Sequence, residues 1–174
     1  VAEPWNSAAA LSGKGWVAAT TTEMQSTVPE KVLLVLREFS QTREDEHVRL
    51  IAALIEAGTF CEKPENRKRL AEILARPSYF DVPANLVENS LINPFNAGKE
   101  RRHILNFVEF GGGRFGCPTR QQGAQVFEMV RALSKALQSQ SLRKEIVPKV
   151  FRSDLYERAM RLVQERCDKA RPPD

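Results

Sequence analysis

Most of the chain carries apolar residues at helical spacing. From residue 28 onward, apolar side chains recur three and four positions apart, which places them on one face of an α-helix. The spacing predicts the following helices: 28–41, 43–60, 64–77, 81–91, 119–137 and one that begins at 153 and ends before 171. The chain is therefore expected to be predominantly α-helical.

The ends of these helices carry recognisable signals. Pro29 and Glu30 suit the first turn of a helix, and Asp81 is a suitable N-cap for residues 81–91. Thr119 followed three residues later by Gln122 matches a capping box. These signals predict where the individual helices begin.

The apolar faces predict which side chains lie in the core. The stripes expected to be buried are Val48, Ile51, Ala52 and Ile55; Leu70, Ile73 and Leu74; Leu86, Val87 and Leu91; Val126, Val130, Leu133 and Leu137; and Tyr156, Met160, Val163 and Cys167. Each stripe covers one side of its helix, which is typical of helices packed into an array.

Two segments break the helical pattern. Residues 93–118 read as loop, short strand and loop, with the strand over Ile104–Phe110 and a turn at the Gly111–Gly113 run. At the start of the chain, residues 7–11 suit a short helix and Trp16–Thr21 a strand. A lone strand is unstable in water, so Trp16–Thr21 pairs either with Ile104–Phe110 or with chain upstream of residue 1.

The division of the chain follows from this change of pattern. Residues 1–27 form one segment with a short helix and a strand. Residues 28–174 form a mostly helical part with the irregular segment at about 93–118 inside it. The whole length corresponds to about one domain or to a lobe of something larger.

Composition excludes several classes of protein. The chain has 174 residues, of which 42% are hydrophobic and 28% charged, as in folded globular proteins. Its net charge of +4 is spread among acidic residues, whereas nucleic-acid binding needs a clustered basic surface. The three cysteines, Cys61, Cys117 and Cys167, match neither a disulfide framework nor a zinc motif. No apolar run reaches the roughly 20 residues of a membrane span.

The chain also lacks the usual catalytic motifs. Neither a nucleophile elbow nor a phosphate-binding loop is present. His47 lies in an acidic first turn and is expected to be solvated, and His103 is expected at the surface. Glu109 and Glu128 are the carboxylate pair best suited to acid–base chemistry, but nothing in the sequence places them in one cleft. The sequence therefore indicates a protein that is not an enzyme and uses no cofactor or metal.

Two short stretches suit a small polar ligand. Glu3-Pro4-Trp5-Asn6 combines a rigid proline, an aromatic ring and polar ends, as in the wall of a cleft. Lys31 lies at the expected start of a helix, where its ammonium and backbone N–H groups can hold an anion. The alternative is that Trp5 packs in the core and Lys31 is solvated, and the residues alone favour this alternative.

The motifs resemble those of a known family, the nitrate- and bicarbonate-binding proteins of ABC transporters, which includes cytoplasmic nitrate sensors that pair with an antiterminator. The matching stretches are VAEPWNSAAALSGKGWVAATTTEMQSTVPEKVL, ALIEAGTFCEKPENRKRLAEILARPSYFDVP and VFRSDLYERA, in that order. The resemblance runs from residue 1 to about 162 and covers the C-terminal part, well under half, of a family member.

The resemblance implies a fold and a ligand. The fold is the α/β periplasmic-binding-protein-like class (type II), present here incompletely, which closes two lobes on a small oxyanion. Lys31 resembles the lysine that supplies positive charge to nitrate, and Glu3 and Trp5 lie by the cleft and hinge. Bicarbonate binders tend not to keep that lysine, so the resemblance favours nitrate or nitrite over bicarbonate.

The sequence departs from the family pattern at several positions. Ala2 stands where the family usually has glycine, which alters the approach of the backbone to a ligand. Gln122 stands where the family usually has histidine, and the helix after it has aliphatic residues in place of tryptophans. The loop over residues 93–115 lacks acidic and aromatic character typical of transporter members. These departures bear on which anion the chain binds and on whether it serves a transporter.

We therefore hypothesise that the chain is the C-terminal portion of a nitrate-type solute-binding protein, whose upstream part supplies the other wall of the cleft. Its ligand site comprises Lys31, Trp5, Glu3 and Ala2, and its partners are the membrane subunits of an ABC transporter. The alternative is a cytoplasmic nitrate sensor that binds a regulatory protein, which three unpaired cysteines favour. The transporter role implies a periplasmic or membrane-associated location. An enzyme of the thiamine-precursor type would need a catalytic histidine or cysteine in the cleft.

Self-association is a further expectation from the sequence. If the partners of Trp16–Thr21 lie upstream, this strand leaves an unpaired edge, and unpaired edges recruit other chains. We therefore expect the isolated chain to associate by strand or segment exchange.

Overall fold

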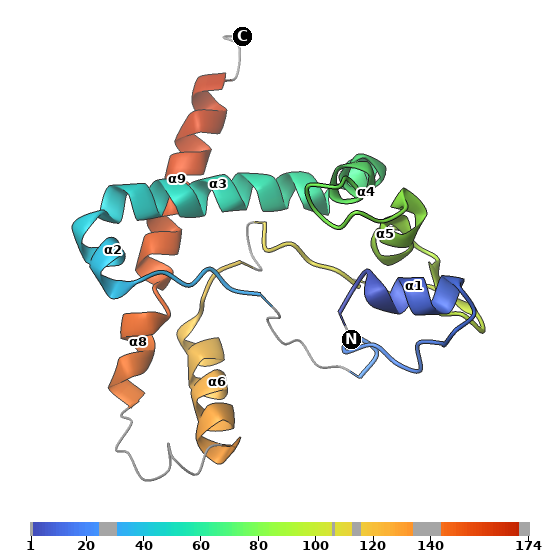
Figure 1. The fold of residues 1–174 in the computed structure, drawn as a ribbon. Helices are drawn as coiled ribbons and strands as arrows, with labels where there is room; N and C mark the ends of the chain where they lie inside the picture. Colours follow the sequence, from blue (N-terminus) through green and yellow to red (C-terminus); the bar gives the residue numbers. More distant parts are fainter. Residues whose placement is uncertain (1, 25–30, 106, 113–115, 134–143, 171–174) are drawn as a thin grey trace. The chain divides into compact units, whose positions relative to one another are not determined.

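The computed structural model describes residues 2–24, 31–105, 107–112, 116–133 and 144–170 (Figure 1). These residues form two compact units, each built from two stretches of the chain. One unit combines Val1–Leu34 with Thr59–Phe110, and the other combines Val35–Gly58 with Gly111–Asp174. The division predicted between residues 27 and 28 falls in an interval outside the described residues and stays a prediction.

The first unit is a small helical array with a hairpin. Its helices are α1 (Trp5–Leu11), the 3₁₀ turn η1 (Pro64–Asn66), α4 (Arg67–Leu74) and α5 (Ala84–Leu91). Strands β1 (Phe95–Asn96) and β2 (Arg101–Arg102) pair antiparallel, with Phe95 opposite Arg102. Helix α5 packs against both α4 and α1. The short helix predicted near residues 7–11 is confirmed as α1.

A compact apolar cluster supports the hairpin. Phe95, Ala97 and Ile104 are buried, and Val17 and Phe107 pack against them. The ring centroids of Phe95 and Phe107 lie 4.7 Å apart, in a tilted arrangement of the kind that aromatic pairs favour. This cluster joins the stretch that follows α1 to the hairpin, so it determines the position of the N-terminal segment.

The second unit is helical. It contains α2 (Arg37–Thr42), most of α3 (Glu44–Glu62), α6 (Arg120–Leu133), the 3₁₀ turn η2 (Lys144–Ile146), α8 (Val147–Val150) and α9 (Ser153–Ala170). Its core joins two helices, and its buried members are Val48, Ala52, Ile55, Leu155, Tyr156 and Ala159. The predicted inward face of α3 is therefore confirmed.

The capping box predicted for α6 is also confirmed. The backbone N–H of Gln122 donates to Thr119 Oγ1 at 3.2 Å, and the Gln122 side-chain oxygen accepts from the Thr119 backbone at 3.0 Å. Asp81, in contrast, does not cap α5. The N-cap position of α5 is occupied by Pro83, and Asp81 has a positive φ of 51°.

Residues 31–36 are the largest departure from the predicted helices. They are non-helical, and α2 begins only at Arg37. The reason lies in Val32–Leu36, an unbroken apolar run whose periodicity suits a strand as well as a helix. The first turn predicted at Pro29 and Glu30 lies outside the described residues.

The strand predicted over Ile104–Phe110 is wrong. The described residues of this stretch are not in a strand, and the hairpin lies earlier, at 95–102. Its turn contains Gly98, whose φ of 98° is a conformation that glycine adopts readily and other residues rarely do. Trp16–Thr21 forms no strand either, but the Val17 N–H donates to the Ala97 carbonyl at 2.9 Å.

Several predicted burial patterns are also corrected. In α9 Tyr156 is buried as predicted, but its buried neighbours are Leu155 and Ala159, and Met160 and Cys167 are exposed. In α6, Val130 and Leu133 are exposed, and Leu137 lies outside the described residues. Periodicity locates a face only to within one position when neighbouring residues are both apolar.

His47 is buried, contrary to the prediction of a solvated side chain. It is 5% exposed, its Nδ1 lies 3.2 Å from Ser40 Oγ, and its ring lies 5.7 Å from that of Phe39. Burial lowers the pKa of His47, and the nearby Arg152 lowers it further, against the opposite effect of Glu44 and Asp154. The imidazole is therefore neutral over a wider pH range than a free histidine.

This burial predicts how the second unit responds to acid. Because the unfolded chain binds the imidazole proton at a higher pH than the folded chain does, protonation favours unfolding. The free energy of unfolding is expected to fall as the pH drops below about 6.5, by up to about 1.4 kcal/mol per pH unit. Urea unfolding followed by circular dichroism, repeated at each pH, measures this slope.

The two histidines provide a matched pair for that experiment. His103 is exposed, as predicted, so His103→Gln is expected to leave the pH dependence unchanged. His47→Gln is expected to flatten it below about pH 6.5. An equal slope in His47→Gln and the unsubstituted protein would contradict the assignment of this effect to His47.

Candidate functional site

The start of α1 exposes the aromatic residue and buries the proline. Pro4 is among the most deeply buried side chains, whereas Trp5 is 53% exposed. The alternative in which Trp5 packs in the core is therefore wrong. Half of the indole surface is free to contact a ligand, and the buried Pro4 anchors the backbone beside it.

Glu3 is held by the helix that follows it, α1. Its Oε2 accepts hydrogen bonds from Ser7 Oγ at 2.7 Å and from the Ser7 backbone N–H at 3.2 Å. Ser7 is buried and its Oγ accepts from Asn89 Nδ2 at 2.9 Å. The carboxylate therefore has a structural task, which is to fix the first turn of α1.

Asn89 extends this connection to the hairpin. Its Oδ1 accepts from the Asn96 N–H at 2.9 Å, and its Nδ2 also donates to the Asn96 carbonyl at 3.1 Å. The chain of contacts Glu3–Ser7–Asn89–Asn96 thus joins α1, α5 and β1 through side chains that are mostly covered. Such a network gives the backbone at the start of α1 a defined position.

Ala2 and Lys31 are both exposed. The Ala2 carbonyl accepts from the Trp5 N–H at 3.1 Å, which closes the first turn. Lys31 lies in the non-helical stretch before α2, so the prediction that a helix N-terminus assists its charge is wrong for the described residues. Within those residues, no hydrogen bond or ion pair joins Lys31 to Ala2, Glu3 or Trp5.

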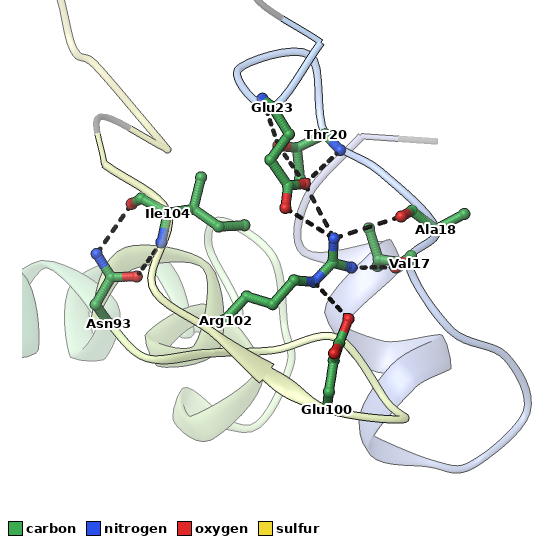
Figure 2. A network of polar contacts seen from close by, with 8 residues as sticks. All are labelled: Val17, Ala18, Thr20, Glu23, Asn93, Glu100, Arg102 and Ile104. Carbon is green, nitrogen blue, oxygen red and sulfur yellow. Dashed lines mark hydrogen bonds and ion pairs between the residues drawn. The ribbon is translucent and has the colours of Figure 1, made fainter.

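Arg102 organises a second polar network in the same unit, shown in Figure 2. Its Nη1 lies 2.8 Å and 3.1 Å from the two carboxylate oxygens of Glu23, and 3.4 Å from the Ala18 carbonyl. Its Nη2 donates to the Val17 carbonyl, and Nε lies 3.4 Å from Glu100 Oε1. The Arg102 side chain is only 18% exposed, so one guanidinium clamps the stretch after α1 against β2.

Contact with Arg102 changes the pKa of Glu23. Burial alone acts to raise the pKa of Glu23, but hydrogen bonds from Thr20 and Arg102 outweigh it, and the pKa lies below its ordinary value. Two carboxylates, Glu23 and Glu100, face the single positive charge of Arg102. The guanidinium is neutralised within the protein, so Arg102 positions the segment and does not offer its charge to an anion.

Sequence reasoning missed both networks. Arg102 belongs to a short basic run that reads as an ordinary surface, and its partners lie about 80 positions away in the chain. Asn89 and Ser7 are likewise 82 positions apart. No local spacing signals a contact of this length.

The cysteines and acidic residues add no further site. Burial raises the pKa of the Cys61 and Cys117 thiols, which makes both less reactive, and Cys167 is exposed. In the part of the chain that the structure describes, no group of three metal-ligating side chains lies close enough to hold an ion. The described helices also include none with the length and apolar character needed to span a membrane.

Comparison with known proteins finds partial similarity to one family. Residues 1–75 match the model of the NMT1-like family. The nitrate/nitrite binding protein NrtA of Nostoc sp. is 22% identical over 166 residues, which are 94% of this chain and 37% of that protein. The chain is a partial relative of the nitrate- and bicarbonate-binding proteins. No solved structure matches it significantly.

Two further relatives are transport proteins named for nitrate or bicarbonate. The nitrate import ATP-binding protein NrtC of Synechocystis sp. is 28% identical over 92% of this chain, and the chain spans 24% of its length. The bicarbonate-binding protein CmpA of Synechococcus elongatus is 28% identical over 60% of the chain, which covers 23% of that protein. The chain thus spans between a quarter and about two fifths of the nitrate relatives it matches.

The family match agrees with the predicted fold class. An NMT1-like sequence implies a periplasmic-binding-protein-like fold, and the described residues are mostly helical with one two-stranded sheet. All four predicted ligand residues, Ala2, Glu3, Trp5 and Lys31, fall inside the matched range of residues 1–75.

Proposed function

We propose that this chain forms part of a type II periplasmic-binding-protein-like protein that binds nitrate or nitrite for an ABC transporter. One observation carries the proposal: relatives named for nitrate align with more than nine tenths of the chain, and the family match contains every candidate ligand residue. The function is binding, without catalysis. The membrane subunits of the transporter are its partners.

The exposed groups suit a small oxyanion. Nitrate is a flat monoanion whose oxygens accept hydrogen bonds, so a site for it combines a positive charge with donors and a shaped wall. Lys31 supplies the charge, Trp5 supplies the wall, and the backbone at Ala2 and Glu3 supplies polar contacts. The Glu3–Ser7 hydrogen bonds hold that backbone before a ligand arrives.

The proposal includes a second wall of the anion cleft, supplied by residues outside this chain. Proteins of this class close two lobes on their ligand, and this chain spans 37% of NrtA of Nostoc. By itself the chain is therefore expected to bind nitrate weakly, with a dissociation constant on the order of 1 mM or higher. Tight binding in titration calorimetry would contradict this part of the proposal.

Residue-resolved titration tests the site directly. Proton–nitrogen NMR spectra of the labelled chain are recorded with rising nitrate and, separately, with chloride at equal ionic strength. Nitrate is expected to shift the amides of residues 2–6 and 31 more than chloride does. No difference between the two anions would refute the proposed function.

A matched pair of lysine variants isolates the charge. Lys31→Ala is expected to abolish the nitrate-specific shifts, because it removes the positive charge that the proposal assigns to the anion. Lys14→Ala removes an exposed lysine of the same unit and is expected to leave them unchanged. If both variants respond as the unsubstituted protein does, Lys31 is not the cation.

The free thiols favour a second candidate function. Cys61, Cys117 and Cys167 are unpaired, which suits a reducing compartment and hence a cytoplasmic nitrate sensor that binds a regulatory protein. The sequence encoded upstream distinguishes the two functions. A signal peptide or lipobox there supports transport, and its absence supports sensing.

A further inference from the structure

Asn89 uses its whole side-chain amide to join α1 to the hairpin. Its Nδ2 donates to Ser7 Oγ at 2.9 Å and to the Asn96 carbonyl at 3.1 Å, and its Oδ1 accepts from the Asn96 N–H at 2.9 Å. An amide side chain offers two N–H donors and one carbonyl acceptor, and here all three have partners within the protein. Helices α1 and α5 lie side by side in this unit (Figure 1), so Asn89 on α5 connects α1 with β1.

The hydrogen bonds from Asn89 to Glu3 run in one direction. Ser7 has a single hydroxyl hydrogen, which it donates to Glu3 Oε2 at 2.7 Å. The Ser7 oxygen therefore accepts from Asn89, and the side chain at position 89 has to supply a donor. An aspartate at this position is nearly the same size but has no N–H to offer. The order Asn89, Ser7, Glu3 is thus determined by the donors and acceptors that each side chain has.

Ser7 is the link between Asn89 and the first turn of α1. It is fully buried, so its oxygen has no contact with solvent and depends on Asn89 for a donor. Its hydroxyl and its backbone N–H both donate to Glu3. The Ala2 carbonyl accepts from the Trp5 N–H in the same turn. The backbone of residues 2–5 is therefore held from the side of α5.

The other end of α1 is attached to the hairpin by different residues. The Val17 N–H donates to the Ala97 carbonyl at 2.9 Å, and Arg102 donates to the Val17 carbonyl. Neither contact involves Asn89. Loss of the Asn89 side chain is therefore expected to loosen the start of α1 while the stretch after this helix stays attached.

We propose that Asn89 is a positioning residue of the anion site. Through Ser7 and Glu3 it holds the backbone of residues 2–5 in the conformation that receives nitrate, although it lies 82 positions from Ser7 in the chain. This inference rests on the proposed function, in which that backbone supplies polar contacts to the anion. A site that is ordered before the ligand arrives binds more tightly, because binding then loses less conformational entropy.

Amide hydrogen exchange tests the positioning without nitrate. In Asn89→Ala the Ser7 and Trp5 amides are expected to exchange about three- to tenfold faster, because one hydrogen bond of the series is lost. Asn85 is exposed and lies one turn earlier in α5, so Asn85→Ala is the matched control and is expected to change neither rate. The Ala75 amide at the end of α4 is expected to keep its rate in both variants.

A second variant separates the lost donors from lost packing. Asn89→Asp keeps the size of the side chain and the oxygen that accepts from the Asn96 N–H, and it removes the N–H donors. The same acceleration at Ser7 and Trp5 is expected. Circular dichroism of each variant establishes that it is folded before its exchange is measured.

Nitrate titration by NMR connects the positioning to affinity. Asn89→Ala is expected to raise the dissociation constant about three- to tenfold, and Asn85→Ala is expected to leave it unchanged. Ser7→Ala breaks the same series one step nearer the anion. The double variant of Ser7→Ala and Asn89→Ala is therefore expected to bind no more weakly than Ser7→Ala alone. General loss of stability would not produce this non-additivity.

Three results would overturn the proposal. Unchanged Ser7 and Trp5 exchange in both Asn89 variants means that the start of α1 is held without Asn89. Faster exchange with unchanged nitrate affinity means that this backbone does not determine binding. Additive effects of Ser7→Ala and Asn89→Ala mean that Asn89 acts by another route.

Failure of the proposed function gives a different result. An unsubstituted chain without any nitrate-specific shift refutes nitrate binding. The exchange rates of the Ser7 and Trp5 amides are measured without nitrate, so they decide independently whether Asn89 holds this backbone.

Discussion

Phe95→Ala is expected to lower the free energy of unfolding of the first unit by about 3–5 kcal/mol. Phe95 is among the largest fully buried side chains and lies at the centre of the cluster with Ala97, Ile104 and Val17. Its removal leaves a cavity against the ring of Phe107. Because this cluster is small, few neighbouring side chains are available to fill the space.

Tryptophan fluorescence in urea measures this effect selectively. Both tryptophans, Trp5 and Trp16, belong to the first unit, so their emission reports its unfolding. Phe80→Ala removes a ring that is partly exposed and is expected to cost less than about 1 kcal/mol. A similar midpoint shift in both variants would contradict the central position of Phe95 in the core.

Arg102→Ala is expected to destabilise the same unit by about 2–3 kcal/mol. The substitution removes the donors that satisfy Glu23 and the Val17 and Ala18 carbonyls (Figure 2). Hydrogen bonds to charged groups contribute about 1.5–3 kcal/mol, and the part-buried Val17 carbonyl loses its partner as well. The stretch after α1 then loses its attachment to β2, which alters the position of the proposed anion site.

A local readout separates the clamp from general loss of packing. Because Arg102 is one of the groups that lower the pKa of Glu23, this pKa is expected to rise in Arg102→Ala, as followed by carboxyl NMR. The exposed neighbour provides the control, and Arg101→Ala is expected to change neither the stability nor the Glu23 pKa. An unchanged Glu23 pKa in folded Arg102→Ala would exclude the clamp.

The same carboxylate gives the clamp a pH dependence. A carboxyl group with a lowered pKa in the folded state stabilises the fold at pH values above its ordinary pKa. This contribution is lost as the pH falls through the folded-state pKa. Acid therefore weakens the first unit through Glu23 and the second unit through His47, in different pH windows.

Local sequence signals predicted the long helices well. The apolar stripe of α3 and the capping box of α6 depend on residues within one or two turns of each other, and both are present as expected. Helices α4, α5 and α9 also lie where the periodicity placed them. Backbone periodicity and capping are local properties, so the sequence contains the information they need.

The candidate site was predictable only in part. The exposed Trp5 and Lys31 were named from residue type and from the family resemblance, and the relatives support the family. Their surroundings were not predictable, since Glu3 reaches Ser7 and, through it, Asn89 and Asn96 in distant parts of the chain. The nitrate titration tests which of these residues contact the anion.

By itself the sequence determined the helical character of this protein, its resemblance to nitrate- and bicarbonate-binding proteins and the absence of common catalytic motifs, because these follow from local spacing and residue type. Tertiary structure alone decided that His47 is buried and that Arg102 clamps a segment about 80 positions away. It also decided that residues 31–36 are non-helical and expose apolar side chains. Burial and long-range pairing depend on which segments meet in space, and no local pattern records that.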